Sequence, residues 1–350
     1  MLLMLPSAHP APLPWRRRLL LGGAGFLVAR AAGAQTPSGP ALTDVLETGK
    51  DIHALRAVAV MRDGQLLAQR AYGGGSVETL FRINSATKSV SAVLVGSTIA
   101  QGKLGGLSQT LGELLPDAAA ANPGSAAAGV TLGQVLTGTT GLKFDWMTEF
   151  RALATATDPV RYAFQLPREG PTGASWTYND AAVGLLSPIL ERARGIALTE
   201  IARQDLFGPL GIDAFEWQRD RAGRPTSYAG LRLRVADLAK LAWLMADGGQ
   251  WQGKRVLPAD WVAQSTRQQV GRAWPNPPIT DAGYGFLWFT GRYKDVPVAW
   301  AWGYGAQFAL AAPSLRLAVA TAATEPPPQQ LPAQNAAVAG LVARILDAFG

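Results

Sequence analysis

Strand-like segments lie near both ends of this 350-residue chain, and helix-like segments fill the region between them. The apolar runs 58–62 and 66–70 flank Asp63-Gly64, a residue pair that strongly favours the tight turn of a β-hairpin. Beyond residue 280, short apolar or aromatic runs separated by Gly or Pro turns predict strands at 284–289, 298–302, 308–311 and 317–321. We therefore expect an α+β fold with flanking helices, in which one antiparallel sheet is built from both chain ends.

The segments between the strands have the spacing of helices. Apolar residues recur at helical intervals from Val90 to Ile99, which predicts a helix that opens at Ser85. Further helices are predicted at 42–47, 132–136, 159–164, 180–192, 198–206 and 235–245, with an amphipathic helix at 336–349. We expect residues 35–350 to form one domain, with a sheet part at about 45–84 and 282–350 and an inserted, mostly helical part at about 85–281. A cleft between the two parts is the natural place for a functional site.

The N-terminal segment has the pattern of an export signal. Arg16, Arg17 and Arg18 precede an apolar stretch at 19–28, and Ala32-Gly33-Ala34 provides a small-residue cleavage site. The apolar stretch is much shorter than the roughly 20 residues that a membrane-spanning helix needs, which disfavours the alternative of a membrane anchor. We expect residues 1–34 to be a twin-arginine-type signal peptide that is read by the Tat export machinery of a bacterium. The remaining chain would then be periplasmic or secreted, without a stable membrane anchor.

Charge and residue types exclude several kinds of function. Four of the arginines behind the formal net charge of +7 lie in residues 1–34, and no basic run follows, so nucleic acid is not an expected partner. The chain has no cysteine, which excludes thiol nucleophiles, disulfides and thiolate metal sites. Its two histidines are His9, inside the expected signal, and His53, at the start of a predicted strand. We interpret His53 as structural, and we expect no metal and no cofactor.

The spacing of Ser85 and Lys88 places a hydroxyl and an amine on the same face of the predicted helix. Lys88 could then accept the proton of Ser85 Oγ if burial keeps the amine neutral. Among the seven lysines of the chain, Lys88 alone has a serine three residues before it. The spacing by itself is common, and a solvated polar start of a helix is its alternative meaning. Because histidine and cysteine are so scarce, serine assisted by lysine is nonetheless the main route left to a hydrolase.

Two further segments offer the groups that such a nucleophile needs. Tyr178 lies where a loop meets the predicted helix at 180–192, and a neighbouring ammonium would lower its pKa so that it could relay a proton. A packed tyrosine beside a helix-capping Asn or Asp is the alternative. Gly303 and Gly305 mark a strand that lets a ligand approach closely and offers N–H groups to an oxyanion, although a structural bulge would have the same pattern.

In this order, these segments resemble the serine hydrolases of the penicillin-recognising fold. That family includes class C β-lactamases, DD-peptidases, β-lactamase-like esterases and 6-aminohexanoate-dimer hydrolases. The resemblance extends over about residues 45–348 and also involves 136–142, 237–240 and 248–261. It implies a β-lactamase/transpeptidase-like fold and an acyl-enzyme formed on Ser85 without a metal or organic cofactor. It further implies Lys88 as the base partner, Tyr178 as the proton relay, and the backbone N–H groups of Ser85 and Gln307 as the oxyanion hole.

Two departures from the family pattern narrow the expected substrate. Asp180 stands where these enzymes usually have asparagine, and a carboxylate near Lys88 would hold the amine cationic. Tyr304, Gly305 and Ala306 replace the usual cation, short hydroxyl and glycine, a set that holds a substrate carboxylate. We therefore expect a small-molecule ester or linear amide as the substrate. A weak β-lactamase or D-amino-acid peptidase is the alternative enzyme, and a catalytically silent ligand-binding module is the alternative outside enzymes.

Aromatic residues fall in the segments that are expected to line the cleft. The predicted substrate pocket consists of Trp146, Trp176, Asp180, Trp302, Gly303, Tyr304 and Gly305. The rings would suit an apolar acyl or alcohol group, although each could equally belong to the core. Asp145 and Glu149 could contact a cationic substrate, although solvated loop acids are the default interpretation.

Overall fold

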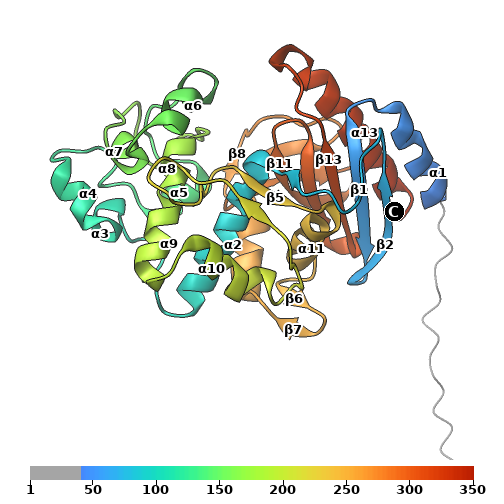
Figure 1. Ribbon diagram of the computed structural model, residues 1–350, viewed down its shortest axis with the longest axis horizontal. Coiled ribbons are helices and arrows are strands. Elements are labelled where there is room, and N and C mark those ends of the chain that lie inside the picture. The colour runs from blue at the N-terminus through green and yellow to red at the C-terminus, as the bar shows by residue number, and fades with distance from the viewer. Residues whose placement is uncertain (1–40) are drawn as a thin grey trace, which may run out of the picture. The chain divides into compact units, whose positions relative to one another are not determined.

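The computed structural model describes residues 41–350, and the expected signal peptide at 1–34 lies outside the described residues. Within them, one antiparallel sheet contains the strands β1 (Leu55–Arg62), β2 (Gln65–Ala71), β8 (Val270–Gly271), β9 (Thr280–Tyr284), β10 (Phe289–Tyr293), β11 (Val296–Gly303), β12 (Gln307–Ala312) and β13 (Leu317–Ala323). Their order across the sheet is β2-β1-β13-β12-β11-β10-β9-β8. Strands from the two ends of the chain, β1 and β13, therefore lie side by side in this sheet (Figure 1).

Helices surround this sheet and form a second part beside it. They are α1 (Leu42–Glu47), α2 (Thr87–Ala100), α3 (Leu111–Leu114), α4 (Pro116–Ala121), α5 (Leu132–Thr137), α6 (Trp146–Thr155), α7 (Pro159–Phe164), α8 (Asp180–Gly184), α9 (Leu186–Arg194), α10 (Leu198–Ala202), α11 (Val235–Ala246), α12 (Ala259–Thr266) and α13 (Leu331–Asp347). The sheet lies between α1 and α13 on one side and α2 and α11 on the other, and α3 to α9 gather in the helical part (Figure 1). Within residues 41–350, no helix is long and apolar enough to cross a membrane.

Strand β1 joins the two ends of the chain. It pairs with β2 across a turn in which Asp63 has a φ of 51° and Gly64 a φ of 78°. On its other edge it pairs with β13, from Leu55 opposite Ala323 to Arg62 opposite Leu317. The structure thus confirms the predicted hairpin and the α+β fold with an antiparallel sheet built from both chain ends.

Side chains of β11 and β12 alternate between large and small, as the two-residue period of a strand requires. Trp300 pairs with Leu310, and both side chains lie in a layer that α13 covers. The neighbouring pair Ala299 and Ala311 faces the other side of the sheet. The predicted strands 298–302, 308–311 and 317–321 are confirmed within β11, β12 and β13.

The prediction of one strand at 284–289 is wrong, because Tyr284 ends β9, Phe289 begins β10, and residues 285–288 form the turn between these two paired strands. Leu287 has a φ of 57°, which a continuous strand does not allow. The backbone N–H of Phe286 donates to Ser265 O, and that of Leu287 donates to Leu136 O. The run is apolar because other segments bury it, and burial alone does not distinguish a packed turn from a strand.

The middle of the chain also contains small sheets that the helical patterns did not predict. β3 (Phe81–Arg82), β5 (Leu231–Leu233) and β4 (Glu216–Trp217) form one of them, and β6 (Gln250–Trp251) and β7 (Lys254–Arg255) form another. The helix predicted at 180–192 is divided into α8 and α9 at Leu185. These strands have only two or three residues each, which is too short for a periodic pattern to reveal them.

Candidate active site

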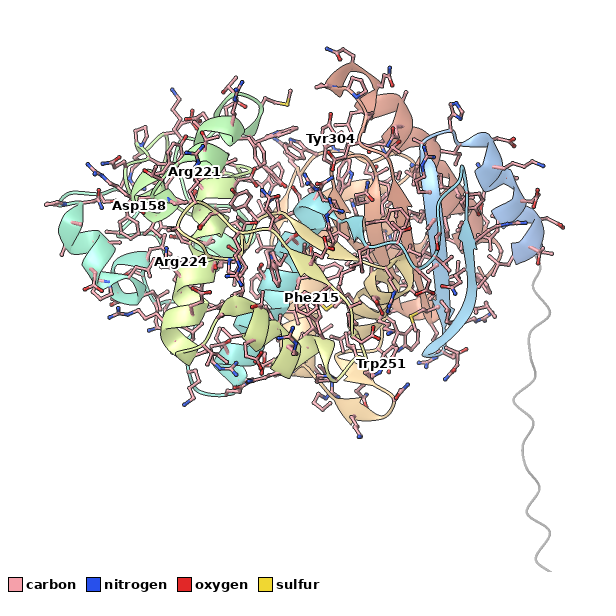
Figure 2. All side chains as sticks on the ribbon, viewed as in Figure 1. Asp158, Phe215, Arg221, Arg224, Trp251 and Tyr304 are labelled. Atoms are coloured by element: carbon pink, nitrogen blue, oxygen red, sulfur yellow. The ribbon has the colours of Figure 1, made fainter. Side chains whose placement is uncertain are left out.

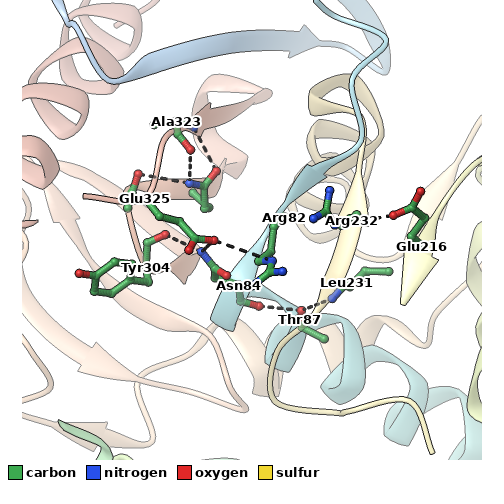
Figure 3. A network of polar contacts seen from close by, with 11 residues as sticks. Arg82, Asn84, Thr87, Glu216, Leu231, Arg232, Tyr304, Ala323 and Glu325 are labelled. Atoms are coloured by element: carbon green, nitrogen blue, oxygen red, sulfur yellow. Dashed lines mark hydrogen bonds and ion pairs between the residues drawn. The ribbon is translucent and has the colours of Figure 1, made fainter. Parts of the chain in front are cut away.

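Ser85 lies in a single 3-10 turn, η2 (Asn84–Ala86), that directly precedes α2. The helix was predicted to open at Ser85 itself, so the difference is one short turn. Pairing of β3 with β5 places the chain immediately before this turn. Asn84 has a φ of 49°, and its Nδ2 donates to Tyr304 O at 2.9 Å and to Glu325 Oε1 at 3.2 Å (Figure 3). The serine is thereby fixed between the helix and the hairpin of β11 and β12.

This hairpin approaches the serine turn through glycine. A Cβ atom on Gly303 would lie 2.1 Å from Ile83 O, so no other residue fits there without movement. Strand β10 begins at Phe289, which pairs with Trp300 of β11. Among the described strands, none therefore pairs with residues 301–303 on the β10 side of β11. An unpaired strand edge offers N–H and C=O groups to an extended ligand.

The candidate oxyanion donors lie on these two elements. Ser85 N–H is among the first amides of the helical turn, which have no partner within a helix. Gln307 begins β12 opposite Gly303. Its side chain is held at both ends by the backbone of Ala323, since Nε2 donates to the carbonyl at 2.7 Å and Oε1 accepts from the N–H at 3.1 Å. The backbone of Gln307 is thus anchored on the hairpin that packs against Ser85.

Lys88 is buried in the first turn of α2, with an exposed fraction of 2%. Its Nζ lies 2.6 Å from Asp180 Oδ1 and donates to Tyr228 O at 2.8 Å. It also lies 4.5 Å from the centre of the Tyr178 ring. Desolvation lowers the pKa of Lys88, while the charge of Asp180 acts in the opposite direction. The structure therefore brings together three residues that the sequence singled out, from segments far apart in the chain.

Tyr178 behaves differently from the sequence-based expectation. Desolvation and the charge of Asp180 raise the pKa of Tyr178 well above its usual value, whereas its polar contact with the Ser85 side chain lowers it. The prediction that a neighbouring ammonium would lower the pKa of Tyr178 is wrong, because burial and the carboxylate outweigh the other effects. Tyr178 is consequently a neutral phenol at neutral pH, placed against both Ser85 and Lys88.

The segment around Tyr178 also has a structural role. Asn179 caps α8, since its Oδ1 accepts a hydrogen bond from Ala182 N at 2.9 Å. The segment therefore has both roles that the sequence suggested. Asn179 caps a helix, and the adjacent Tyr178 and Asp180 contact Lys88. The cap fixes the first residue of α8, and Asp180 projects from there to Lys88.

A cluster of aromatic rings surrounds Tyr178. Trp146 and Trp176 lie 6.4 Å and 6.2 Å from the Tyr178 ring between centroids, as expected for pocket residues. Trp274, which the sequence did not single out, lies closer, at 4.6 Å with an interplanar angle of 32°. It also contacts Trp146 at 5.9 Å and Trp176 at 5.3 Å. Trp274 comes from the loop between β8 and β9, where no periodic pattern marks a functional position.

The remaining predicted pocket residues lie on the β11–β12 hairpin, and Trp302 is joined to the cluster through Phe289, which lies 6.2 Å from Trp176 between ring centroids. Trp302 packs on Phe289 and Phe308, at centroid distances of 5.3 Å and 5.8 Å. The hydroxyl of Tyr304 donates to Pro326 O at 2.7 Å, and the residue lies on the side of the sheet part that faces the helical part (Figure 2). Both belong to the β11–β12 hairpin and its packing rather than to the walls around Tyr178.

Two acidic residues and one histidine have simpler roles. Asp145 Oδ1 accepts from Met147 N at 2.9 Å, and Glu149 Oε2 accepts from Asp145 N at 2.6 Å, so both carboxylates cap α6. His53 is exposed in the turn before β1. Within residues 41–350, no group of three or more His, Asp or Glu side chains is placed to hold a metal ion.

The chain is similar in sequence to proteins of one family. Residues 50–344 match the family model described as Beta-lactamase. A 6-aminohexanoate-dimer hydrolase of Paenarthrobacter ureafaciens is 25% identical over 256 residues, which cover 68% of this chain and 62% of that relative. The chain thus spans less than two thirds of the length of this relative.

Solved structures share the fold. A Bacillus anthracis protein provisionally assigned as a 6-aminohexanoate-dimer hydrolase superposes with a TM-score of 0.73 at 16% identity, over 86% of this chain and 82% of that one. A class C β-lactamase from Rhodobacter sphaeroides superposes with a TM-score of 0.62 at 19% identity, over 87% of this chain and 99% of that one. These similarities confirm the predicted β-lactamase/transpeptidase-like fold. Together with the family match over most of the described residues, they show that this chain belongs to the β-lactamase family.

Proposed function

We propose that this protein is an exported serine hydrolase that cleaves carboxylic esters or linear amides through an acyl-enzyme on Ser85. The observation that carries the proposal is the grouping of Lys88, Tyr178 and Asp180 beside Ser85. The Lys88 amine is buried 2.6 Å from Asp180, and Tyr178 contacts both Lys88 and Ser85. A serine next to a buried amine and a neutral phenol has the partners that acyl transfer requires.

In the first step Ser85 Oγ attacks the substrate carbonyl carbon, and its proton passes to the neutral form of Lys88. Tyr178, which its raised pKa keeps protonated, gives its proton to the departing alcohol or amine. The Lys88 ammonium then gives a proton to Tyr178, so Lys88 and Tyr178 return to their starting forms and the net change is the transfer of one proton from Ser85 to the leaving group. The N–H groups of Ser85 and Gln307 would stabilise the oxyanion. In the second step water attacks the acyl ester, and its proton returns by the same groups to Ser85 Oγ.

Asp180 has two opposing effects in this scheme. It holds Lys88 in place beside the serine, and its charge also favours the ammonium form that is unable to act as a base. Burial of the amine favours the neutral form. The reactive fraction of Lys88 is therefore set by a balance between desolvation and one carboxylate.

The substrate class follows from the strand beside the serine. Tyr304, Gly305 and Ala306 provide neither a cation nor a short hydroxyl for a substrate carboxylate, which disfavours β-lactams. The aromatic rings around Tyr178 suit an apolar group. The name of the Paenarthrobacter ureafaciens relative points in the same direction, since a 6-aminohexanoate dimer is a linear amide.

Turnover of three substrates tests the proposal. Purified residues 35–350 would be given a short-chain p-nitrophenyl ester, a linear aminohexanoate amide and a chromogenic cephalosporin. We expect ester or amide turnover that is lost in Ser85→Ala. Turnover that survives this substitution would contradict the mechanism. Turnover of the cephalosporin alone would instead favour a weak β-lactamase or D-amino-acid peptidase, and no turnover or acylation of any substrate would favour a silent binding module.

Export is tested separately. We propose that the Tat machinery recognises Arg16 and Arg17 and that the chain is cleaved after Ala34, which leaves a periplasmic or secreted enzyme. Expression of the full chain in a bacterium should give a processed periplasmic protein, whereas Arg16→Lys combined with Arg17→Lys should leave the precursor in the cytoplasm. Processing that is unaffected by this double substitution would contradict the Tat assignment.

A further inference from the structure

A groove of about 730 Å³ lies on the sheet, and none of its lining residues belongs to the candidate active site. We name it the arginine groove, and its defining residues are Arg267, Arg272, Thr290, Arg292, Ala299 and Ala311. Its volume is in the range of sites that hold small molecules. The segments that line it include the end of α12 and strands β8 to β12.

The floor of the arginine groove is made of small side chains. Ala299 and Ala311 are paired across β11 and β12 and face the same side of the sheet. On this face of the sheet, helix α11 packs against β1, β12 and β13. The part of the sheet around β10 and β11 lies next to the area that α11 covers. Alanines at these positions leave apolar space where larger residues would fill the groove. A short apolar chain fits such a surface.

The rim of the groove is positively charged. Its lining side chains include three arginines, Arg267, Arg272 and Arg292, and one acidic residue, Asp281. Within residues 41–350, neither Arg267 nor Arg272 forms an ion pair. Arg292 Nη2 donates to Asp295 O at 2.8 Å and lies 4.0 Å from Asp295 Oδ1, at the limit of an ion pair. Guanidinium groups on a concave surface attract anions and bind carboxylates in a bidentate geometry.

A polar group in the floor is also without a partner. Thr290 has an exposed fraction of 4%, and its Oγ1 forms no hydrogen bond with any described residue. A buried hydroxyl without a partner costs free energy. Thr290 thus leaves a hydroxyl without a hydrogen-bond partner among the residues that line the groove, which is an observation independent of the arginines.

We propose that the arginine groove binds a small amphipathic carboxylate, separately from the active site. The carboxylate lies between the arginines, the Thr290 hydroxyl donates to one of its oxygens, and the apolar chain covers Ala299 and Ala311. The N-terminal residues 1–34 are an unsuitable occupant, because they contain four arginines and no acid. The proposal does not depend on the reaction at Ser85.

Titration calorimetry of the purified protein with octanoate tests this site. We expect saturable binding that weakens about tenfold or more in Arg267→Gln combined with Arg272→Gln. Octanamide, which has the same chain without the charge, should bind more weakly, and so should inorganic phosphate, which has charge without a chain. Arg161→Gln, an exposed arginine on α7, is the matched control and should leave octanoate binding unchanged.

A second variant tests the floor. Ala299→Val narrows the groove without changing its charge, and we expect it to weaken octanoate binding while phosphate binding stays the same. Ester turnover should be unchanged in the arginine variants, which separates this site from the active site. The proposal is overturned if octanoate shows no saturable binding up to on the order of 10 mM, or if binding is unaffected in both groove variants. Phosphate binding as tightly as octanoate would also overturn it.

Discussion

Lys88 Nζ lies 2.6 Å from Asp180 Oδ1, and the side chains of both residues are 3% exposed. The resemblance to penicillin-recognising serine hydrolases implies a neutral asparagine where Asp180 stands, so the carboxylate changes the electrostatics of the site. It offsets the desolvation that lowers the pKa of Lys88, and it raises the pKa of Tyr178. One substitution thus acts on both groups that are proposed to move protons.

Replacement of Asp180 by Asn should move the acidic limb of the pH profile of kcat/KM to lower pH. Loss of the carboxylate removes the charge that raises the pKa of Lys88, so the neutral amine would be present at lower pH. Ester turnover measured between pH 4 and 10 checks the direction. Asp237→Asn is the matched control, because Asp237 is a buried acid 2.7 Å from Lys240 outside the site. A limb that stays in place, or moves equally in the control, would contradict the assignment of Lys88.

Removal of the Tyr178 hydroxyl should lower kcat without loss of the fold. Tyr178→Phe keeps the ring that contacts Trp274 and Lys88 and removes only the group that carries the proton. We expect kcat to fall by a factor on the order of 10² to 10⁴, with a Tm close to that of the unmodified protein. Full activity in this variant would show that the leaving group takes its proton from elsewhere.

Trp274 should act as a positioning residue for Tyr178. In Trp274→Ala the nearest ring at 4.6 Å is lost, so Tyr178 gains freedom to move away from Ser85. We expect a decrease in kcat of about tenfold or more with a smaller change in KM. Trp274→Phe should restore most of the activity, because it keeps an aromatic face. If Trp274→Ala has the kcat of the unmodified protein, packing at this position has no effect on the reaction.

The close approach of Gly303 to Ile83 should make even alanine harmful there. A Cβ atom would lie 2.1 Å from Ile83 O, so the hairpin and the Ser85 turn would have to separate. We expect Gly303→Ala to lower kcat by a factor on the order of 10², comparable to loss of an oxyanion donor. Gly129→Ala serves as the control, since a Cβ atom there meets no atom within 4 Å. Equal activity of the two variants would contradict the proposed contact.

His53 should be dispensable. It is exposed in the turn before β1, and His53→Ala should leave kcat/KM nearly unchanged and alter the free energy of unfolding by no more than about 0.5 kcal/mol. Steady-state kinetics and urea unfolding measure both quantities. A large loss of activity would mean that a histidine takes part in the reaction, and the scheme built on Lys88 would have to be abandoned.

Sequence patterns correctly predicted those helices, strands and turns that are specified by residues close together in the chain. The Asp63-Gly64 turn, the strands at 298–302 and 317–321, and the helix after Ser85 all follow from turn preference or periodicity over a few residues. The segment 284–289 shows where this fails, since its central residues Phe286 and Leu287 form a turn whose backbone N–H groups bond to Ser265 and Leu136 rather than to a neighbouring strand. Trp274 shows a second failure, because its loop has no period and its partner Tyr178 lies in a distant segment.

The sequence by itself determined the family, the antiparallel sheet and the spacing of Ser85 and Lys88, because each is encoded in neighbouring residues or in ordered motifs. Only the tertiary structure decided that Asp180 contacts Lys88, that Trp274 covers Tyr178, and that the pKa of Tyr178 is raised rather than lowered. Proton affinities depend on burial and on distances through space. Spacing along a chain does not specify either of them.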